Sequence, residues 1–291
     1  MIAQVGGCVS VTRRVLLSWP FISALSPRSL TRQENTGREL ITGVACEAGL
    51  SAPLTLGMAR VIVRPDAVAV ATTPGGVRVF VVESGTLAIG VTSPSQPSIS
   101  ADELATTVPM PDQNDEIVLS AGEARSFVSR SVASVRNPGK RPAVALDVAV
   151  FHQEPRTLLC AFTTSSGVSF QLLASASAAQ CPEGRIHITL ERLRIGAGGE
   201  IPSDLRRGLT LSYVDAGTLS LRRIAGEVFS GRGAAAAPYS VPGALQLLAD
   251  GKERDITAGS TIFLTESARV EAVNQRDRAV AILVLAVRGA A

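Results

Sequence analysis

Residues 81–87 read Val-Val-Glu-Ser-Gly-Thr-Leu, and residues 213–219 read Tyr-Val-Asp-Ala-Gly-Thr-Leu. Each stretch runs from strand-forming residues to an acidic residue, a small residue, a glycine, a threonine and a leucine. A glycine between two such runs is typical of a hairpin turn, because glycine adopts positive φ without a steric penalty. The two stretches therefore predict the same β-hairpin at two places in one chain.

Further landmarks recur in the same order around each hairpin. Asn137 follows Gly122 by fifteen positions, and Asn274 follows Gly259 by the same interval. A basic residue and the triplet Ala-Val-Ala come after each asparagine, at 141–145 and at 278–281. Upstream, Ala-Arg-Val at 59–61 occupies the place of Glu-Arg-Leu at 191–193. Repetition of ordered landmarks indicates a duplicated domain.

The remaining pattern is that of an all-β protein. Short runs rich in β-branched residues are separated by turn signals such as Pro74-Gly75-Gly76 and Asn137-Pro138-Gly139. The expected strands are 60–63, 77–83, 143–151, 188–195, 209–215, 218–224, 260–264 and 279–287. Residues 91–116, which contain several prolines and serines, are expected to form a long surface loop.

The chain of 291 residues is long enough for two ordinary domains, and with 46% hydrophobic and 18% charged residues it can bury a sizeable core. We expect an N-terminal leader or poorly ordered segment at 1–50, a first barrel at 51–151, a connector at 152–185 and a second barrel at 186–291. Within the connector, 168–173 has the composition of one further strand.

Composition argues against two classes of partner. The net charge is only +3, and no basic run or aromatic-plus-basic face stands out, so nucleic-acid binding is not expected. No stretch reaches the roughly 18 apolar residues of a membrane-spanning helix. The paired arginines Arg13-Arg14, followed by a short apolar run, predict secretion through a twin-arginine-like signal; the alternative is a cytoplasmic protein with an extended start.

The four cysteines have no spacing typical of a zinc site. In an exported protein Cys160 and Cys181 would form a disulfide across the connector, and the alternative is two buried free thiols.

On these repeated landmarks the sequence resembles the bicupins of the cupin superfamily over about residues 51–290. The resemblance implies two tandem all-β cupin barrels, which are double-stranded β-helices of jelly-roll-like form. In cupins, two histidines and a glutamate of a first motif and a histidine of a second motif bind one metal inside the barrel. The glutamate stands seven positions before the glycine of the first motif.

In this chain the motif positions hold other residues. In the second repeat Gly217 assigns the glutamate place to Thr210, the first two histidine places to the neighbourhood of Asp204 and Arg206, and the third to Val270. In the first repeat Gly85 assigns the glutamate place to Arg78; the histidine places fall at about Thr72 and Pro74, and on Ala133. A transition-metal site needs about three imidazole, thiolate or carboxylate ligands, and an arginine repels a cation. We therefore expect no metal and no other cofactor.

The leading hypothesis is a cupin-domain protein without metal-dependent catalysis, whose barrel interiors either are filled by side chains or hold a small organic ligand. Its candidate ligand-binding residues are Asp204, Arg206, Thr210 and Arg78, since a guanidinium at a barrel mouth can hold a carboxylate or phosphate. No catalytic residue is assigned. His152 and His187 lie off the motif positions, and Asn137 and Asn274 are interpreted as structural turn residues.

Two alternatives stay open. One is a metal-independent isomerase or epimerase that draws acid–base groups from Arg206, Asp204, His187 or Tyr213. The other is a structural module in which the barrels pair into homo-oligomers.

Overall fold

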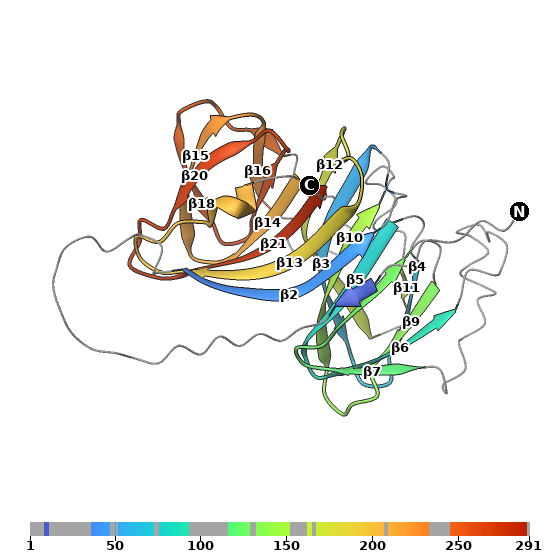
Figure 1. Ribbon diagram of the computed structural model, residues 1–291. Coiled ribbons are helices and arrows are strands. Elements are labelled where there is room, and N and C mark those ends of the chain that lie inside the picture. The colour runs from blue at the N-terminus through green and yellow to red at the C-terminus, as the bar shows by residue number, and fades with distance from the viewer. Residues whose placement is uncertain are drawn as a thin grey trace, which may run out of the picture.

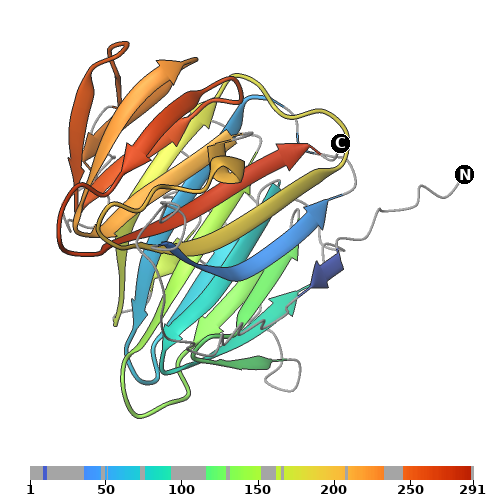
Figure 2. The ribbon, with the colours of Figure 1, turned by 60° about the vertical axis from the view of Figure 1, so that its left-hand side comes forward.

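The computed structural model describes residues 9–11, 36–46, 50, 52–72, 76–92, 116–128, 132–151, 162–164, 167–206, 209–232 and 245–289. Its described part is built almost wholly from antiparallel strands, and the two repeats lie side by side (Figures 1 and 2). The one described element that is not a strand is a short 3-10 helix, η5, at Ser203–Arg206. An all-β fold is thus confirmed.

The first repeat forms two sheets. Its strands are β3 (Leu54–Val63), β4 (Val68–Thr72), β5 (Gly76–Ser84), β6 (Thr86–Thr92), β7 (Ile117–Ser120), β8 (Ala124–Val128), β9 (Val132–Arg136) and β10 (Ala143–Phe151). One sheet has the order β3-β10-β5-β8 and the other the order β4-β9-β6-β7. The sheets face each other across an apolar interior that includes Val61, Phe80, Leu87 and Val135.

The second repeat has the same strand order. Its strands are β13 (Ile186–Ile195), β14 (Leu209–Ala216), β15 (Thr218–Ala225), β16 (Val228–Arg232), β17 (Gln246–Leu247), β18 (Glu253–Thr257), β19 (Ser260–Leu264), β20 (Arg269–Val273) and β21 (Val280–Gly289). The order β13-β21-β14-β19 matches the first sheet, and β20-β15-β18 matches β9-β6-β7 of the second. An isolated bridge between Glu200 and Val273 stands where β4 pairs with β9. The chain therefore has the tandem-barrel fold of a bicupin.

Each repeat is preceded by a strand that pairs with the other repeat. β2 (Thr36–Cys46) pairs with β13, and β12 (Val168–Ala178) pairs with β3. Two short strands, β1 (Val9–Val11) and β11 (Phe162–Thr164), add to β2 and β4. The interval from β2 to β12 is the same as from β3 to β13, and both long pairings contain a bulge, at Ile41 and at Leu173. The duplicated unit thus includes its leading strand.

The two exchanged strands lie in segments that the sequence assigns to a leader and to a connector. Residues 36–46, which the sequence assigns to a leader, form the strand β2, which extends the second repeat's main sheet by pairing with β13. The strand expected at 168–173 is present and extends to residue 178. The twin-arginine segment, most of the loop at 91–116, Cys8, His152 and Cys160 lie outside the described residues. No helix in the described part is long and apolar enough to span a membrane.

The hairpin glycines explain why the repeat was visible in the sequence. Gly85 and Gly217 have φ values of 77° and 85°. A Cβ atom added at Gly85 would lie 2.9 Å from Ala143 Cα, and one added at Gly217 would lie 2.9 Å from the Ala279 carbonyl oxygen. A side chain is therefore excluded at both positions for two reasons. The positive φ disfavours any residue but glycine, and the neighbouring backbone leaves no room for a Cβ atom.

Three apolar clusters stabilise this arrangement. One fills each barrel, and the third lies between the barrels, where Leu56 and Val79 of the first repeat join Leu190 and Leu285 of the second. This shared cluster packs the main sheets of the two repeats against each other.

Candidate functional site

The first barrel holds an arginine where cupins place the metal-binding glutamate. Arg78 lies on β5, two residues before Phe80. Because every second residue of a strand points to the same side, Arg78 shares the face of Phe80, whose side chain belongs to the barrel's apolar interior. Only 1% of Arg78 is exposed. Its guanidinium donates from Nε to Asp147 Oδ1 at 2.7 Å and from Nη2 to Asp147 Oδ2 at 2.6 Å, and it lies 5.4 Å from the Phe80 ring centroid. The site is a buried bidentate ion pair.

This pair does not fit a metal. Asp147 on β10 is 6% exposed, and both of its oxygens accept hydrogen bonds from Arg78. Its one carboxylate is thus engaged by a permanent cation, which would repel a second positive charge. A fixed cation and its counterion therefore occupy the place that the resemblance gives to a metal ligand.

The second barrel is filled at the equivalent place. Thr210 is 1% exposed and donates from Oγ1 to the Leu205 carbonyl oxygen at 3.2 Å. Thr210 at the glutamate place and Val270 at the third histidine place line the same cavity inside the second barrel. The cavity has a volume of only about 10 Å³, which is about the space of one water molecule. A threonine hydroxyl among apolar groups offers no metal site.

Asp204 does not join this interior. It lies in η5 with a half-exposed side chain, and its Oδ2 accepts a hydrogen bond from Arg38 Nη1 at 2.6 Å. Arg206 ends the same short helix, and its side chain lies outside the described ones. Of the four candidate ligand-binding residues, the described side chains therefore form no common pocket. Arg78 and Thr210 face different barrels, and Asp204 is at the surface.

Sequence reasoning missed a second arginine–carboxylate pair. Arg38 of β2 donates to Glu191 of β13 through Nε at 2.5 Å and Nη2 at 2.8 Å. The Glu191 side chain is 2% exposed, and the hydrogen bonds that Arg38 donates to Glu191 and Asp204 raise the pKa of Arg38 above its usual range. Arg38 was hidden because it lies in a segment expected to be a leader. The signal was Glu191 itself, a carboxylate in register with the apolar residues Leu193 and Ile195 of β13.

The two asparagines are structural, as interpreted from the sequence. Asn137 donates from Nδ2 to the carbonyl oxygens of Val63 and Arg141, at 2.8 Å each. Asn274 makes the same pair of bonds to Ile195 and Arg278, at 2.9 and 2.8 Å. Both side chains are completely buried. Each asparagine thus ties the turn before the last strand of its repeat to the end of the first strand.

The residues proposed for acid–base catalysis are not brought together. His187 is exposed on β13, Asp204 is held by Arg38, and Tyr213 packs in the cluster between the barrels, where burial raises the pKa of its phenol. Among the described residues no three His, Cys, Asp or Glu side chains gather as a metal site would require. Cys181 is a free thiol that contacts the Leu50 carbonyl oxygen at 3.5 Å.

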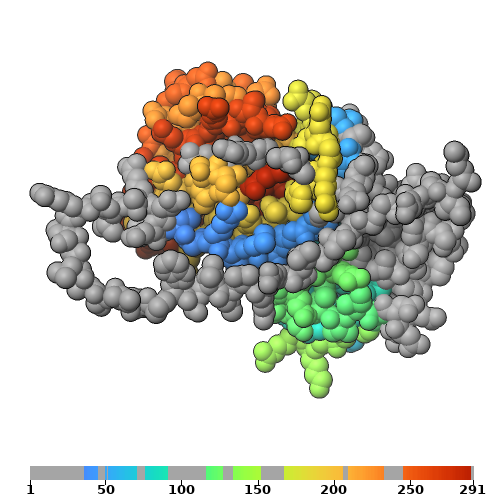
Figure 3. All heavy atoms as spheres, viewed as in Figure 1, coloured from blue at the N-terminus to red at the C-terminus, as the bar shows by residue number. Residues whose placement is uncertain are grey.

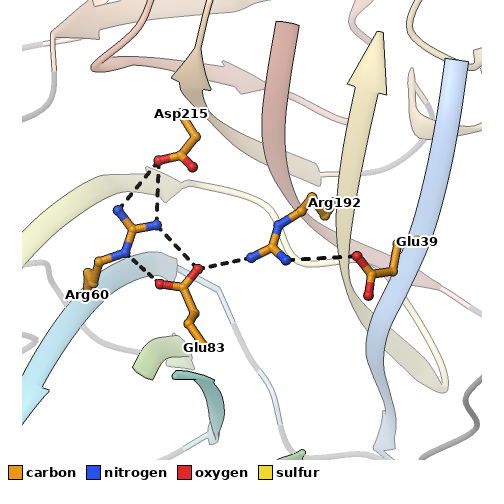
Figure 4. A network of polar contacts seen from close by, with 5 residues as sticks. All are labelled: Glu39, Arg60, Glu83, Arg192 and Asp215. Carbon is orange, nitrogen blue, oxygen red and sulfur yellow. Dashed lines mark hydrogen bonds and ion pairs between the residues drawn. The ribbon is translucent and has the colours of Figure 1, made fainter. Parts of the chain in front are cut away.

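A network of charges joins the two barrels at equivalent positions of the repeats (Figure 4). Arg60 Nε donates to Glu83 Oε2 at 2.7 Å, and Arg60 also lies 3.5 Å from Asp215 Oδ1. Arg192, the equivalent of Arg60, donates to Glu83 Oε1 at 3.0 Å and lies 3.8 Å from Glu39 Oε2. The acidic residue of each repeated hairpin thus faces the repeated arginine of the other half.

Comparison with known proteins finds similarity in structure but none in sequence. No family model and no curated protein matches the chain by sequence. Among solved structures it is similar to AerE from Microcystis aeruginosa, with 10% identity, 84% of this chain and 96% of that chain covered, and a TM-score of 0.43. It is also similar to the oxalate decarboxylase formate complex of Lactobacillus farciminis, with 10% identity, 87% of this chain and 88% of that chain covered, and a TM-score of 0.42. A third similar structure is a cupin 2 conserved barrel domain protein of Leptotrichia buccalis, with 10% identity, 84% of this chain and 89% of that chain covered, and a TM-score of 0.33.

These likenesses carry no residue roles, since all three scores are below 0.5. The strand order and the repeated landmarks of the chain itself define two tandem all-β barrels, the fold that the resemblance to bicupins implies, with other residues at the places that the resemblance gives to metal ligands.

Proposed function

We propose that this bicupin is a binding protein without metal-dependent catalysis. One observation supports this most directly: both glutamate places face a barrel interior, and they hold Arg78 in a buried ion pair and Thr210 beside a cavity of about 10 Å³. The groups at these places neither ligate a transition metal nor leave room for one with its substrate.

Within this proposal the second barrel is the structural half. Its interior is closed by apolar side chains such as Leu221, Ile262 and Val284, so a ligand cannot enter without displacing core residues. The first barrel keeps a permanent cation in an apolar interior, which favours an anionic group such as a carboxylate. Arg78 would recognise a small organic anion in the first barrel only in exchange for Asp147, because that buried carboxylate accepts hydrogen bonds from its Nε and Nη2.

The metal content of the purified protein tests this proposal. We expect far less than one equivalent of zinc, iron, manganese or nickel per chain by elemental analysis, because the described residues of the two barrels gather no set of three ligands. One tightly held transition-metal ion per chain would refute the proposal.

A second candidate, an assembly module, is favoured by the edge strand β12. This strand of eleven residues is the edge strand of its sheet and contains neither a charged residue nor a proline. Such residues usually prevent edge-to-edge pairing of sheets. We expect light scattering to show a homo-oligomer, and the Ser169→Lys variant, at an exposed position of β12, to shift it toward the monomer, since a charge on an edge strand opposes edge-to-edge pairing. A strict monomer at working concentrations would contradict this candidate.

A further inference from the structure

The two repeats differ where each exchanged strand packs against the other barrel. β12 packs closely on the second repeat: Leu173, at its bulge, is 1% exposed, and the Leu173 carbonyl oxygen accepts a hydrogen bond from Thr261 Oγ1 at 3.3 Å. Tyr213 of β14, which is 8% exposed, adds its ring to the same cluster between the barrels. This junction is closed by large side chains.

The equivalent junction around β2 is open. Ile41, at the bulge equivalent to Leu173, is only partly buried, Val81 replaces Tyr213, and Ala124 replaces Thr261. A cleft of about 450 Å³ lies here, with a volume in the range of small-molecule sites. Its walls include Glu39, Leu40, Ile41, Val81, Glu83 and Arg192. We call it the β2 cleft, and Figure 3 shows β2 (blue) at the surface of the molecule.

The charge at the β2 cleft is unbalanced toward the negative. Its charged lining residues are two carboxylates, Glu39 and Glu83, and one arginine, Arg192, which belong to the network of Figure 4. Glu83 contacts both arginines, whereas Glu39 contacts Arg192 only at 3.8 Å and keeps 68% of its side chain exposed. Glu39 is thus the carboxylate with the most accessible oxygens, and it lies beside Leu40, an exposed apolar side chain on the same strand.

We propose that the β2 cleft binds a small protonated amine with a short apolar tail. The ammonium group would meet Glu39 at the mouth, and the tail would lie against Leu40, Ile41 and Val81. A charge-assisted hydrogen bond from an ammonium to a carboxylate is among the stronger polar contacts. This inference rests on the proposed binding function but places the ligand outside both barrels. Metal content therefore tests the proposed function, and amine binding tests the assignment of the β2 cleft.

The test is a titration of the full chain with butylammonium and hexylammonium, in which binding is measured by calorimetry or by changes in NMR chemical shifts. We expect both amines to bind, hexylammonium more tightly, and hexanoate of similar size to bind at least about tenfold more weakly, because its charge is repelled by Glu39. Equal affinity for hexanoate and hexylammonium would overturn the proposal.

Three variants locate the site. Glu39→Gln, at an exposed position that leaves the core intact, should weaken hexylammonium binding about tenfold. Val81→Tyr, which copies the side chain of the closed junction, should abolish it, while Glu271→Gln, in an exposed ion pair with Arg222, should leave it unchanged. Unchanged binding in Glu39→Gln would contradict the assignment even if Val81→Tyr failed to fold.

Discussion

Replacement of Asp147 by alanine is expected to lower the free energy of unfolding by about 3–5 kcal/mol, because it leaves the Arg78 guanidinium buried without its bidentate carboxylate. The pair is closed to solvent, with side chains 1% and 7% exposed. Water therefore cannot replace the lost oxygens without opening the barrel. Urea unfolding of Asp147→Ala beside the unchanged protein measures the difference.

The matched control removes both charges at once. In Arg78→Met/Asp147→Leu, apolar groups of similar volume replace the pair, and the stability should return to within about 1 kcal/mol of the original or exceed it, as is common for buried ion pairs. A loss in Asp147→Ala as small as that of an exposed substitution would show that the pair is not buried as described.

Asn137→Ala and Asn274→Ala are each expected to destabilise the protein by about 2–4 kcal/mol, because each leaves two strand-end carbonyl oxygens without a buried donor. The carbonyls are those of Val63 and Arg141 in one repeat and of Ile195 and Arg278 in the other. Since the two sets of bonds are equivalent, the two losses should be similar. Thermal and urea unfolding measure both.

Gln275→Ala is the neighbouring control. Gln275 donates to Glu253 Oε1 at the exposed surface, so its replacement should change the stability by less than about 0.5 kcal/mol. Asn274→Asp keeps an acceptor but loses the donor, and it should resemble Asn274→Ala. If Asn274→Ala matched Gln275→Ala instead, the asparagine would not hold the turn.

The sequence was sufficient to predict the repeated fold, because its landmarks are under strict steric and hydrogen-bond constraints. The hairpin glycines require positive φ and close strand contact, and the buried asparagines have fixed partners, so both survive at constant spacing. The glutamate places followed from the same glycines. In the structure Thr210 lines the cavity inside its barrel, and Arg78 lies on the interior face of the other barrel.

The exchanged strands were not predictable in the same way. β2 has an ordinary amphipathic pattern, and its partner β13 is about 150 residues away in sequence, as the separation of 153 between Arg38 and Glu191 shows. Local periodicity contains no information on such long-range pairing. The Arg38–Glu191 pair and the β2 cleft both depend on this exchange, so they became visible only in the structure.

One signal in the sequence was available but unused. Asp147 is the one charged residue in the apolar strand β10, and Arg78 is the first charged residue of β5. Opposite charges isolated in two buried strands of one repeat are expected to pair, since an unpaired buried charge is costly. This argument would have placed the ion pair in the first barrel.

The most direct test of the central claim is native mass spectrometry of the full chain after expression with excess manganese, iron, nickel and zinc. We predict that the dominant species has the mass of the polypeptide with no retained transition-metal ion, since Arg78 and Thr210 stand at the glutamate places. A species that keeps one such ion per chain through buffer exchange would contradict the account.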